Sequence, residues 1–369
     1  MLNKLNHFKM NILFALGHPA HYHLFKNTSS ALKMKGHNVH YVITQKDILE
    51  DLLKSNKENY SVLAEREVRG NLFNKFLKIL KSTRSLIKIA RKKDATILIG
   101  CLSQIAYAGK ILRIPSIFVG EDDFSYTWLQ GIITYPFVTK ILAPKPTNVG
   151  PFDYKRISYD GYQKLSYLHS NYFKSNRTLN TTKKKQILIR LVNLSAYHDV
   201  TARGLNNHLL VEFIQIFKEI ANIYISAERK LPEMFEEYRI NIDPNKMHEF
   251  LLNSDLFIGD SQSMAVEASL LGVPNIRINN FASKISVLNE IEFKYKLTKS
   301  LEPEDAYKIT EISKEILLSK DIYNIHLHLR DIMLVDKIDV TAFMVWFIEN
   351  YPESVKIMKE NPDYQLRFK

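Results

Sequence analysis

The stretch LFIGDSQSMAVEASLLGVPNIRI, from Leu256 to Ile278, constrains the fold more than any other part of the chain. It holds an apolar run, a polar turn, a run with helical spacing of small and apolar residues, and a second apolar run, over 256–259, 260–262, 263–271 and 275–278. Gly272 and Pro274 predict the end of the helix, because glycine readily adopts the left-handed backbone conformation and proline does not let a helix restart. The stretch therefore predicts a βαβ unit of a parallel sheet.

The turn of this unit has the chemistry of an anion site. A strand that runs straight into a helix directs unpaired backbone N–H groups, and the positive end of the helix dipole, at whatever lies above the sheet. The hydroxyls of Ser261 and Ser263 add donors for a diphosphate, and Glu267 is placed to bind the neighbouring hydroxyls of a ribose. A second interpretation stays open, in which Ser263 only caps the helix and Glu267 is a solvated acid.

The same alternation of strands and helices fills both halves of the chain. In the first half, strands are predicted over 10–16, 40–44, 94–100, 115–120 and 140–143, and helices over 24–35, 72–93 and 104–112. In the second half, strands are predicted over 186–192 and 222–226, helices over 205–221 and 244–253, and helix from Glu302 onward. The prediction is an α/β protein with an N-terminal domain over 1–150, an interdomain linker over 151–185, a C-terminal domain over 186–340 and a helical segment over 341–369 that packs back on the N-terminal domain.

Composition narrows the class of protein. At 369 residues with 46% hydrophobic residues, the chain can form two packed cores. The single cysteine, Cys101, excludes an internal disulfide, and the sequence has neither a signal peptide nor an apolar run of the ~20 residues that span a membrane, so a cytoplasmic protein is expected. The net charge of +12 calls for an acidic partner, either a nucleotide-activated substrate or anionic lipid. Nucleic acid is the least favoured partner, because zinc-finger spacing and an aromatic RNA-binding strand are absent.

Three sequence patterns resemble a known family. They are GHPAHYHLFKN after the first strand, YDGYQKLSYL in the middle and FIGDSQSMAVEASLLGVPNIR near the end. Together they resemble the DUF354 family, which is similar to GT-B glycosyltransferases and to the hydrolysing UDP-GlcNAc 2-epimerases. The resemblance covers nearly the whole chain. It implies a GT-B-like fold, with two Rossmann-like domains whose parallel sheets face a central cleft and a C-terminal helix that crosses back; the second domain holds a nucleotide-sugar donor and the first faces the acceptor.

The resemblance also implies donor-site residues, carried over from the matching motifs. The residues that match the donor turn of GT-B enzymes and its ribose-binding acid are Asp260, Ser261, Gln262, Ser263 and Glu267. The residues implied beside this turn are His248, in the short helix before it, and Ser226, Ala227 and Glu228, at a neighbouring strand end.

The loop after the first strand supplies candidate catalytic residues. Gly17 and His18 are similar to the Gly-His pair that follows the first strand in many inverting GT-B transferases, where the histidine is the base. From the residues alone, His18 and His21 both suit this role, because they follow a parallel strand and imidazole titrates near neutral pH. Asp122 or Asp123, at the end of a nearby strand, would hold the imidazole in the required tautomer.

Other residues are candidates for contacts with the substrate, and several of the histidines and acidic residues also have simpler interpretations. Lys26 and Arg190 are candidates for contacts with the diphosphate, and Glu121 for a contact with substrate. The simpler interpretations are that His21 caps the following helix, that His23 packs in the interior, and that the acidic trio from Glu121 onward is a solvated loop. A metal site made of the histidines and the acidic trio is less favoured, because GT-B transferases normally rely on the protein's own donors. Neither a metal nor a cofactor is expected.

The expected function is transfer of a sugar from a nucleotide-sugar, expected to be a UDP-sugar, to a saccharide or lipid-linked acceptor in surface polysaccharide or glycolipid synthesis. The first alternative is a hydrolysing nucleotide-sugar 2-epimerase. Those enzymes carry an Arg and a Glu in the first loop, an Asp in a later strand-end loop and a His-Arg-rich turn that opens the second domain, where this chain reads GHPAH, GCLSQ and RLVNLSAYHD. The second alternative is a scaffold that binds a nucleotide-sugar without turning it over.

The helix predicted from Asn74 to Lys93 is amphipathic and has a strongly basic face. The simpler interpretation is a solvated face that covers the first sheet. The alternative is docking on the anionic inner face of a membrane, which a lipid-linked acceptor would require.

Overall fold

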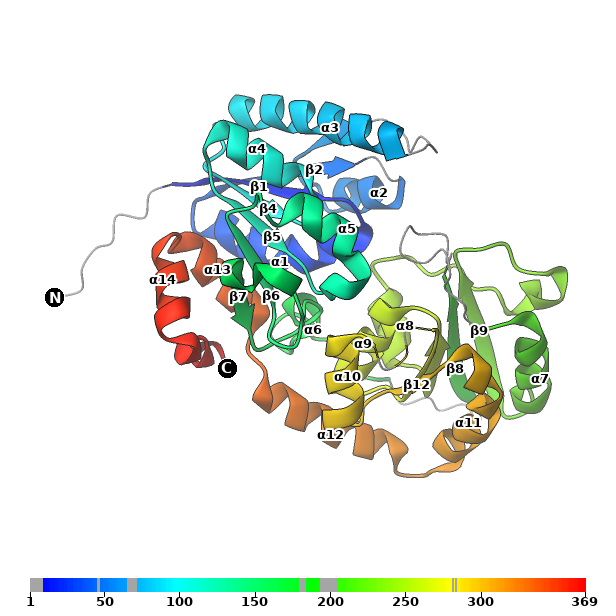
Figure 1. The fold of residues 1–369 in the computed structure, drawn as a ribbon. Coiled ribbons are helices and arrows are strands. Elements are labelled where there is room, and N and C mark those ends of the chain that lie inside the picture. The colour runs from blue at the N-terminus through cyan, green and yellow to red at the C-terminus, as the bar shows by residue number, and fades with distance from the viewer. Residues whose placement is uncertain are drawn as a thin grey trace. The chain divides into compact units, whose positions relative to one another are not determined.

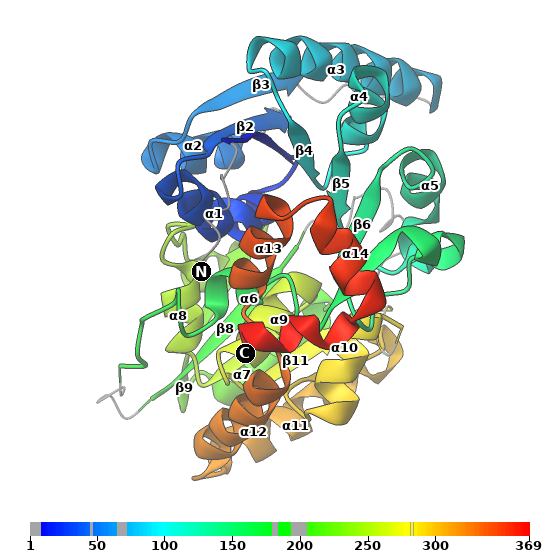
Figure 2. The ribbon, with the colours of Figure 1, turned by 90° about the vertical axis from the view of Figure 1, so that its left-hand side faces the viewer.

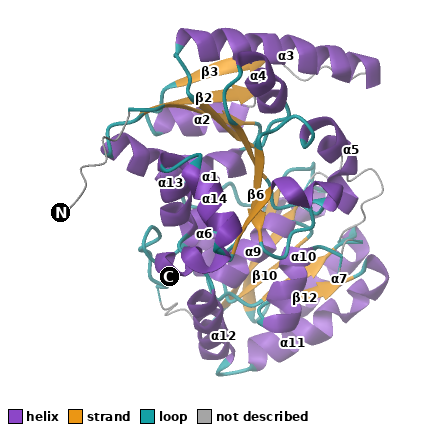
Figure 3. Ribbon diagram, turned by 60° about the vertical axis from the view of Figure 1, so that its left-hand side comes forward, coloured by secondary structure: helices purple, strands orange, loops and turns teal. Residues whose placement is uncertain are grey.

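The computed structural model describes residues 9–44, 47–64, 72–178, 184–192, 205–280, 282 and 284–369. Its contacts divide the chain into unit 1, Met1–Tyr167 with Ile338–Lys369, and unit 2, Leu168–Lys337. Each unit is a parallel sheet flanked by helices, as Figures 1 and 3 show, which confirms the predicted α/β class. The segment RLVNLSAYHD, used above to compare the chain with epimerases, lies outside the described residues from 193 onward. Within the described residues, every helix is too short or too polar to cross a membrane.

Unit 1 contains a seven-stranded parallel sheet of order β3-β2-β1-β4-β5-β6-β7. Its strands are β1 (Asn11–Leu16), β2 (Asn38–Thr44), β3 (Tyr60–Ala64), β4 (Ile97–Gly100), β5 (Ser116–Val119), β6 (Lys140–Pro144) and β7 (Arg156–Tyr159). The inner strands β4 and β5 are buried along their whole length, because helices cover both faces of the sheet. This burial explains why their sequences are continuous apolar runs instead of alternating ones.

The helices of unit 1 form two layers. They are α1 (Pro19–Met34), α2 (Asp47–Ser55), α3 (Leu72–Lys92), α4 (Gln104–Leu112), α5 (Phe124–Thr134), α6 (Leu165–Leu168), α13 (Val340–Glu349) and α14 (Glu353–Glu360), with short 3-10 helices at Gly150–Lys155 and Pro362–Phe368. On one face α1 packs beside α2 and α13, and Figure 2 shows α13 and α14 beside the sheet. On the other face α3 packs on α4, and α4 contacts α5. The C-terminal residues from Ile338 therefore belong to the first unit.

Unit 2 contains a five-stranded parallel sheet of order β12-β11-β10-β8-β9. Its strands are β8 (Lys185–Leu191), β9 (Ala221–Ala227), β10 (Leu256–Gly259), β11 (Asn275–Ile278) and β12 (Lys299–Leu301). Its helices are α7 (Asn207–Phe217), α8 (Met247–Leu252), α9 (Gln262–Leu270), α10 (Ser286–Asn289), α11 (Ile309–Leu318) and α12 (Ile322–Asp336), with short 3-10 or π helices at Glu233–Tyr238, Glu290–Lys294 and Pro303–Lys308. The predicted βαβ unit is β10, α9 and β11, and Gly272 ends it at φ +71°.

Several elements lie beyond the expectations from sequence. The stretch suggested as a linker contains β7, the edge strand of the first sheet, and the first unit continues to Tyr167. Helix α1 begins at Pro19, five residues before the predicted start, because His18 caps it and proline is favourable in the first turn. The elements α2, β3 and α5 were not predicted.

Candidate functional site

Both predicted loops lie where the strand order of their own sheet reverses. In unit 1, β1 pairs with β2 on one side and with β4 on the other. In unit 2, β8 pairs with β9 on one side and with β10 on the other. Open parallel sheets bind ligands beyond the carboxyl ends of the strands at such a switch point, because the two connections leave in opposite directions and open a crevice. The Gly17 loop follows β1, and the Asp260 turn follows β10.

At each switch point a glycine allows the ends of two neighbouring strands to come close together. A Cβ atom on Gly100, the last residue of β4, would lie 2.2 Å from the carbonyl oxygen of Ala15 in β1. A Cβ atom on Gly259, the last residue of β10, would lie 2.6 Å from the carbonyl oxygen of Arg190 in β8. Only glycine therefore permits the strand ends to approach so closely.

In unit 1, the two histidines of the first loop bind the backbone of their own loop. His18 is the N-cap of α1, and its Nδ1 accepts a hydrogen bond from the N–H of Ala20 at 3.2 Å. His21 Nδ1 accepts from the N–H of Gly17 at 3.1 Å. A nitrogen that accepts from a backbone N–H carries no proton, so each neutral ring holds its proton on Nε2. The centres of the two rings are 6.1 Å apart.

These bonds use up the amide donors at the start of α1. Pro19 has no N–H, the N–H of Ala20 is bound by His18, and the N–H of His21 donates to the carbonyl oxygen of His18 at 2.9 Å. The start of α1 therefore presents imidazole groups instead of backbone amides. His18 is exposed and His21 is partly exposed.

The three acidic residues after β5, which are Glu121, Asp122 and Asp123, lie in three different environments. Glu121 forms an ion pair with Lys164 and accepts from the N–H of Gln163 at 2.7 Å, so it anchors the YDGYQK segment. Asp123 is 4% exposed, and its carboxylate accepts from the N–H of Asn148 at 2.7 Å.

The third acid, Asp122, is exposed at the carboxyl edge of the sheet. It is therefore the carboxylate of the trio that is open to solvent.

His23 and Lys26 lie farther along α1 and pack against Tyr167. The ring centres of His23 and Tyr167 are 5.5 Å apart, and the ammonium of Lys26 lies 6.0 Å from the centre of the Tyr167 ring. Burial lowers the pKa of Lys26. Lys26 is two helical turns beyond His18, about 12 Å along the axis, so the structure does not bring it to the first loop. His23 is buried, in agreement with the packing interpretation.

In unit 2, the turn after β10 leaves backbone donors open. Ser261 caps α9, and its Oγ accepts from the N–H of Met264 at 3.3 Å, so the cap is Ser261 and not Ser263 as the sequence suggested. Among the described residues, the N–H groups of Gln262 and Ser263 have no hydrogen-bond partner. Two open amides at the positive end of a helix give this turn donors that could bind an anion.

Asp260 is buried and links this turn to the neighbouring strand. The residue is 2% exposed, and its Oδ1 accepts from the N–H of Val192 at 2.7 Å, which ties the end of β10 to the end of β8. Its Oδ2 is buried and accepts no hydrogen bond from the described part of the chain. Burial raises the pKa of Asp260 to about 6, against the opposing effects of the Val192 bond and of nearby arginines.

Glu267 lies one turn into α9 and is held by His248 of α8. His248 Nε2 lies 3.4 Å from a carboxylate oxygen of Glu267, and both side chains are 9% exposed. The His248 ring also contacts Phe173 edge to face, with ring centres 6.4 Å apart. The burial of both side chains argues against the solvated interpretation of Glu267.

Arg190, Ser226 and Glu228 form one cluster at the ends of β8 and β9. The guanidinium of Arg190 donates to Ser226 Oγ at 2.6 Å and forms an ion pair with Glu228. The three residues were predicted as separate contacts with substrate. In the structure, Ser226 and Glu228 hold the arginine at the carboxyl edge of the sheet.

Three residues of these edges were missed by sequence reasoning. They are Lys164, Asn148 and Asn279. Asn279 follows β11, is 1% exposed, and its Nδ2 donates to the carbonyl oxygen of Asp260 at 3.5 Å. The Asn-Asn pair directly after an apolar strand was the available signal for it. Lys164 and Asn148 gave no such signal, because their carboxylate partners lie far away in sequence.

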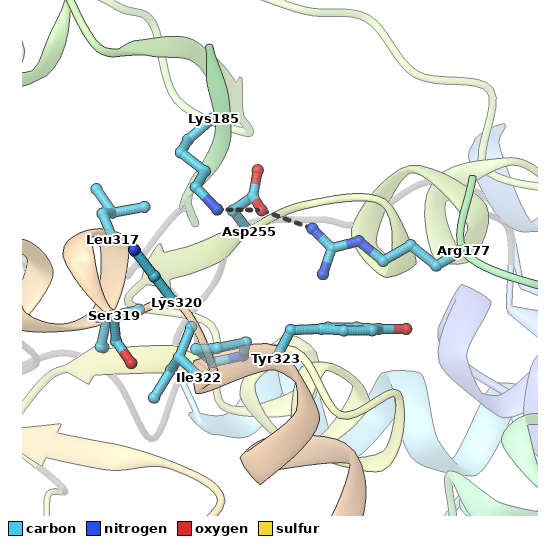
Figure 4. Close-up of a pocket in the computed structure, with 10 residues that line it drawn as sticks. Arg177, Lys185, Asp255, Leu317, Ser319, Lys320, Ile322 and Tyr323 are labelled. Atoms are coloured by element: carbon cyan, nitrogen blue, oxygen red, sulfur yellow. Dashed lines mark hydrogen bonds and ion pairs between the residues drawn. The ribbon is translucent and has the colours of Figure 1, made fainter. Parts of the chain in front are cut away.

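Two pockets occur at the opposite, amino-terminal edges of the sheets. The one in Figure 4 has a volume of about 30 Å³, is lined by Arg177, Lys185, Asp255 and Tyr323 among others, and has room for little more than a water molecule. The pocket in unit 1 has a volume of about 480 Å³ and is lined by residues such as Lys33 and His40. Neither contains a residue of the predicted site. No cluster of metal-ligating side chains occurs among the described residues.

Comparison with known proteins identifies the family. The family model described as "Protein of unknown function (DUF354)" matches residues 10–320. The chain belongs to the DUF354 family. A search of curated protein sequences finds no match.

Solved structures similar to this DUF354 protein have the GT-B fold. A UDP-N-acetylglucosamine 2-epimerase is 13% identical, with a TM-score of 0.62, and the match covers 86% of this chain and 90% of the other. MnaA from S. aureus, solved with UDP, is 13% identical, with a TM-score of 0.62 and coverage of 85% and 90%. The spinosyn rhamnosyltransferase SpnG, solved with thymidine diphosphate, is 16% identical, with a TM-score of 0.60 and coverage of 92% and 100%.

Proposed function

We propose that the protein is a glycosyltransferase that uses a nucleotide-sugar, with a UDP-sugar as the donor. The observation that carries this proposal is the α9 turn, where the open N–H groups of Gln262 and Ser263 lie one helical turn before a buried Glu267 held by His248. An anion site followed on the same helix by a carboxylate suits a nucleoside diphosphate, which combines a doubly charged group with a vicinal diol. The nucleotides bound by S. aureus MnaA and SpnG support this choice of ligand.

In this proposal the α9 turn also stabilises the leaving group. Cleavage of the sugar–phosphate bond leaves additional negative charge on the diphosphate, and fixed N–H groups at a helix start are oriented toward such charge before the reaction begins. Arg190, held by Ser226 and Glu228, adds a positive charge at the same edge of the sheet. Glu267 binds the ribose hydroxyls and so fixes the position of the donor. No metal is required in this scheme.

The acceptor side of the proposal rests on the first loop. His18 is the base that removes the proton of the acceptor hydroxyl, because its ring is exposed at the start of α1 and imidazole titrates near neutral pH. His21 has a different role. Its Nδ1 is bound to the backbone of Gly17, so it donates from Nε2 and keeps the shape of the loop. Asp122 is the exposed carboxylate that would stabilise the imidazolium.

The acceptor is a saccharide or a lipid-linked saccharide, and the pathway is assembly of surface polysaccharide or glycolipid at the inner face of the membrane. The second candidate function is hydrolytic 2-epimerisation, favoured by the similarity to epimerase structures. The departures of the first loop from the epimerase pattern favour transfer. A nucleotide-sugar-binding scaffold is the third possibility.

The first experiment is a thermal-shift screen of the purified protein against a panel of nucleotide-sugars and free nucleotides. A ligand that binds only the native state raises the unfolding temperature by mass action. We expect stabilisation by UDP and by at least one UDP-sugar. Glu267→Ala should abolish this shift, whereas Glu249→Ala, a change on the exposed side of α8, should preserve it. An unchanged shift with Glu267→Ala would contradict the donor assignment.

The second experiment separates epimerisation from the other two functions. The protein is incubated with UDP-GlcNAc without an acceptor, and the products are separated by chromatography. A transferase gives slow hydrolysis or no reaction, an epimerase gives ManNAc and UDP, and a scaffold binds the ligand without turnover. Accumulation of ManNAc at a steady rate would replace the proposed transfer with epimerisation.

A further inference from the structure

The three helices that cover one face of the first sheet contain no acidic residue. The sequences of α3, α4 and α5 have neither Asp nor Glu, although the chain has 39 acidic residues in total. The helices form one layer, visible in Figure 1. Gln104 of α4 donates to Ser82 of α3 at 3.0 Å, and Thr134 of α5 donates to Ser103 at the start of α4 at 2.7 Å. We call the outer side of this layer the α3–α5 face.

Exposed cations follow this face. On α3 they recur every three or four residues, which places them along one side of the helix. The exposed cations of the α3–α5 face are Lys81, Arg84, Lys88, Arg91, Lys92, Lys110 and Arg113. Within the part of the chain that the structure describes, none of them forms an ion pair. Their charges are therefore available to an external partner.

Large apolar side chains are also exposed on the elements of this layer. Trp128 is 54% exposed and Ile111 is 59% exposed, and both belong to the helices of this layer. The others are Leu80, Ile132 and Phe137. Phe137 packs on Tyr107 of α4, with ring centres 5.3 Å apart, which joins the apolar groups of α4 and of the α5 end. A layer of helices that exposes both cations and this many large apolar groups is unusual for a surface that only meets water.

We propose that the α3–α5 face docks on a bilayer that contains anionic lipids. The cations bind the headgroups, and Trp128 with the neighbouring aliphatic side chains enters the boundary between headgroups and hydrocarbon. The choice of a bilayer over nucleic acid rests on Leu80, Ile111 and Ile132, because aliphatic side chains gain free energy in hydrocarbon but cannot stack on bases. This surface belongs to unit 1 alone and does not depend on the proposed donor site.

The test is flotation with vesicles of phosphatidylcholine alone and of phosphatidylcholine mixed with phosphatidylglycerol. The wild-type protein should float with the anionic vesicles and stay at the bottom with the neutral ones. The variant Lys81→Glu/Arg84→Glu/Lys88→Glu should reduce the bound fraction at least tenfold. The matched control Lys218→Glu/Lys299→Glu/Lys314→Glu makes the same change in net charge at exposed lysines of unit 2 and should bind as the wild type does.

A second measurement reports insertion directly. The chain has 2 tryptophans, so the variant Trp346→Phe leaves Trp128 as the single fluorescent reporter. Its emission should shift to shorter wavelength with anionic vesicles and should be quenched by lipids that carry bromine in the acyl chains. Neither change should occur with neutral vesicles.

Three results would overturn the proposal. They are equal flotation with neutral and anionic vesicles, equal loss in the two triple variants, and binding to single-stranded RNA that depends on Lys81, Arg84 and Lys88 while vesicle binding is absent. Thermal shift with UDP separates failure of the membrane proposal from failure of the donor proposal. A variant of the α3–α5 face that no longer binds vesicles but is still stabilised by UDP has an intact donor site.

Discussion

The loop after β1 and the turn after β10 have the same place in their sheets and opposite chemistry. Each lies at a switch point, and each leads into a helix. At the start of α1, Pro19 has no N–H, the His18 side chain accepts from Ala20, and the His18 carbonyl accepts from His21, so these first positions offer no open amide. At the start of α9, the N–H groups of Gln262 and Ser263 are open among the described residues, and the carboxylate below them is buried. The first loop therefore presents imidazoles and the second presents amide donors.

This difference shows what decides the chemistry of a helix start. The backbone geometry is common to both units, but the anion-binding capacity depends on whether nearby side chains already accept from the first amides. The serine cap of α9 satisfies the N–H of Met264 and leaves those of Gln262 and Ser263 open, whereas at α1 a proline, the His18 side chain and the His18 carbonyl remove or satisfy the first three. The comparison predicts that changes in the first loop alter chemistry and changes in the second alter nucleotide binding.

The largest expected effect comes from His18. His18→Ala should lower the rate of sugar transfer by about 10²- to 10⁴-fold, as expected for loss of a general base, with UDP affinity within a few fold of the wild type. His21→Asn should cost less than tenfold, because the asparagine oxygen can still accept from the N–H of Gly17. Transfer rates are measured with the donor found in the thermal-shift screen. Equal losses in the two variants would break the distinction between the two imidazoles.

The second effect concerns the strand ends. Gly100→Ala should unfold unit 1 locally, and Gly259→Ala should do so in unit 2, because each new methyl group would collide with a backbone carbonyl. The expected cost is about 3 kcal/mol for each unit. Hydrogen exchange measured by mass spectrometry on peptides from each unit reports the two effects separately.

Gly36→Ala is the control for these substitutions. Gly36 has φ +91°, and a Cβ atom there would meet nothing within 4 Å. It should cost only the backbone strain of a left-handed alanine, about 1 kcal/mol. A cost at Gly100 or Gly259 no larger than that at Gly36 would contradict the close-approach argument.

Much of the fold was readable from sequence because the inner strands are continuous apolar runs and because Gly272 and Pro274 mark a helix end. The edge strand β7 was missed, since Arg156–Tyr159 buries only alternate residues and lies in a stretch rich in turn residues. The start of α1 was missed because its first turn contains histidines in place of apolar residues. Local composition does not show how an edge strand is paired.

The residues of the candidate site were easier to name than their roles. Residue type and position at a strand end predicted that His21, Glu121 and Asp260 lie near the carboxyl edges. Their partners could not be predicted, because Lys164 lies 43 positions from Glu121 and Val192 lies 68 positions from Asp260. Whether a carboxylate binds substrate or anchors a segment depends on such distant contacts.

The third prediction uses the buried acid of the second turn. The pKa of Asp260 is raised to about 6 in the folded state, above the value of about 3.9 expected in the unfolded chain. The folded state therefore keeps a proton that the unfolded state releases, so this group favours folding below pH 4 and loses that contribution as the pH rises through 6. Asp260→Asn should raise the free energy of unfolding of unit 2 by about 2 kcal/mol above pH 7.

The comparison for this variant is made across pH. Denaturant unfolding of both proteins at pH 8 and pH 5 should give a difference that shrinks at the lower pH. A difference that grows as the pH falls would show that Asp260 is stabilised as a carboxylate.

The smallest predicted effect tests how Glu267, the carboxylate proposed to bind the ribose, is held in place. Glu267→Gln should weaken UDP binding about tenfold, because the amide keeps the size of the side chain but loses its charge and one acceptor. His248→Gln should weaken it by only about threefold, since a 3.4 Å contact orients the carboxylate without binding the ligand. Glu249→Gln is the matched control on α8 and should leave the affinity unchanged. Titration calorimetry with UDP measures all three affinities.

The double variant of Glu267 and His248 decides between two mechanisms. If His248 acts only through Glu267, the double variant binds as Glu267→Gln does; if the two losses multiply, His248 contacts the nucleotide itself.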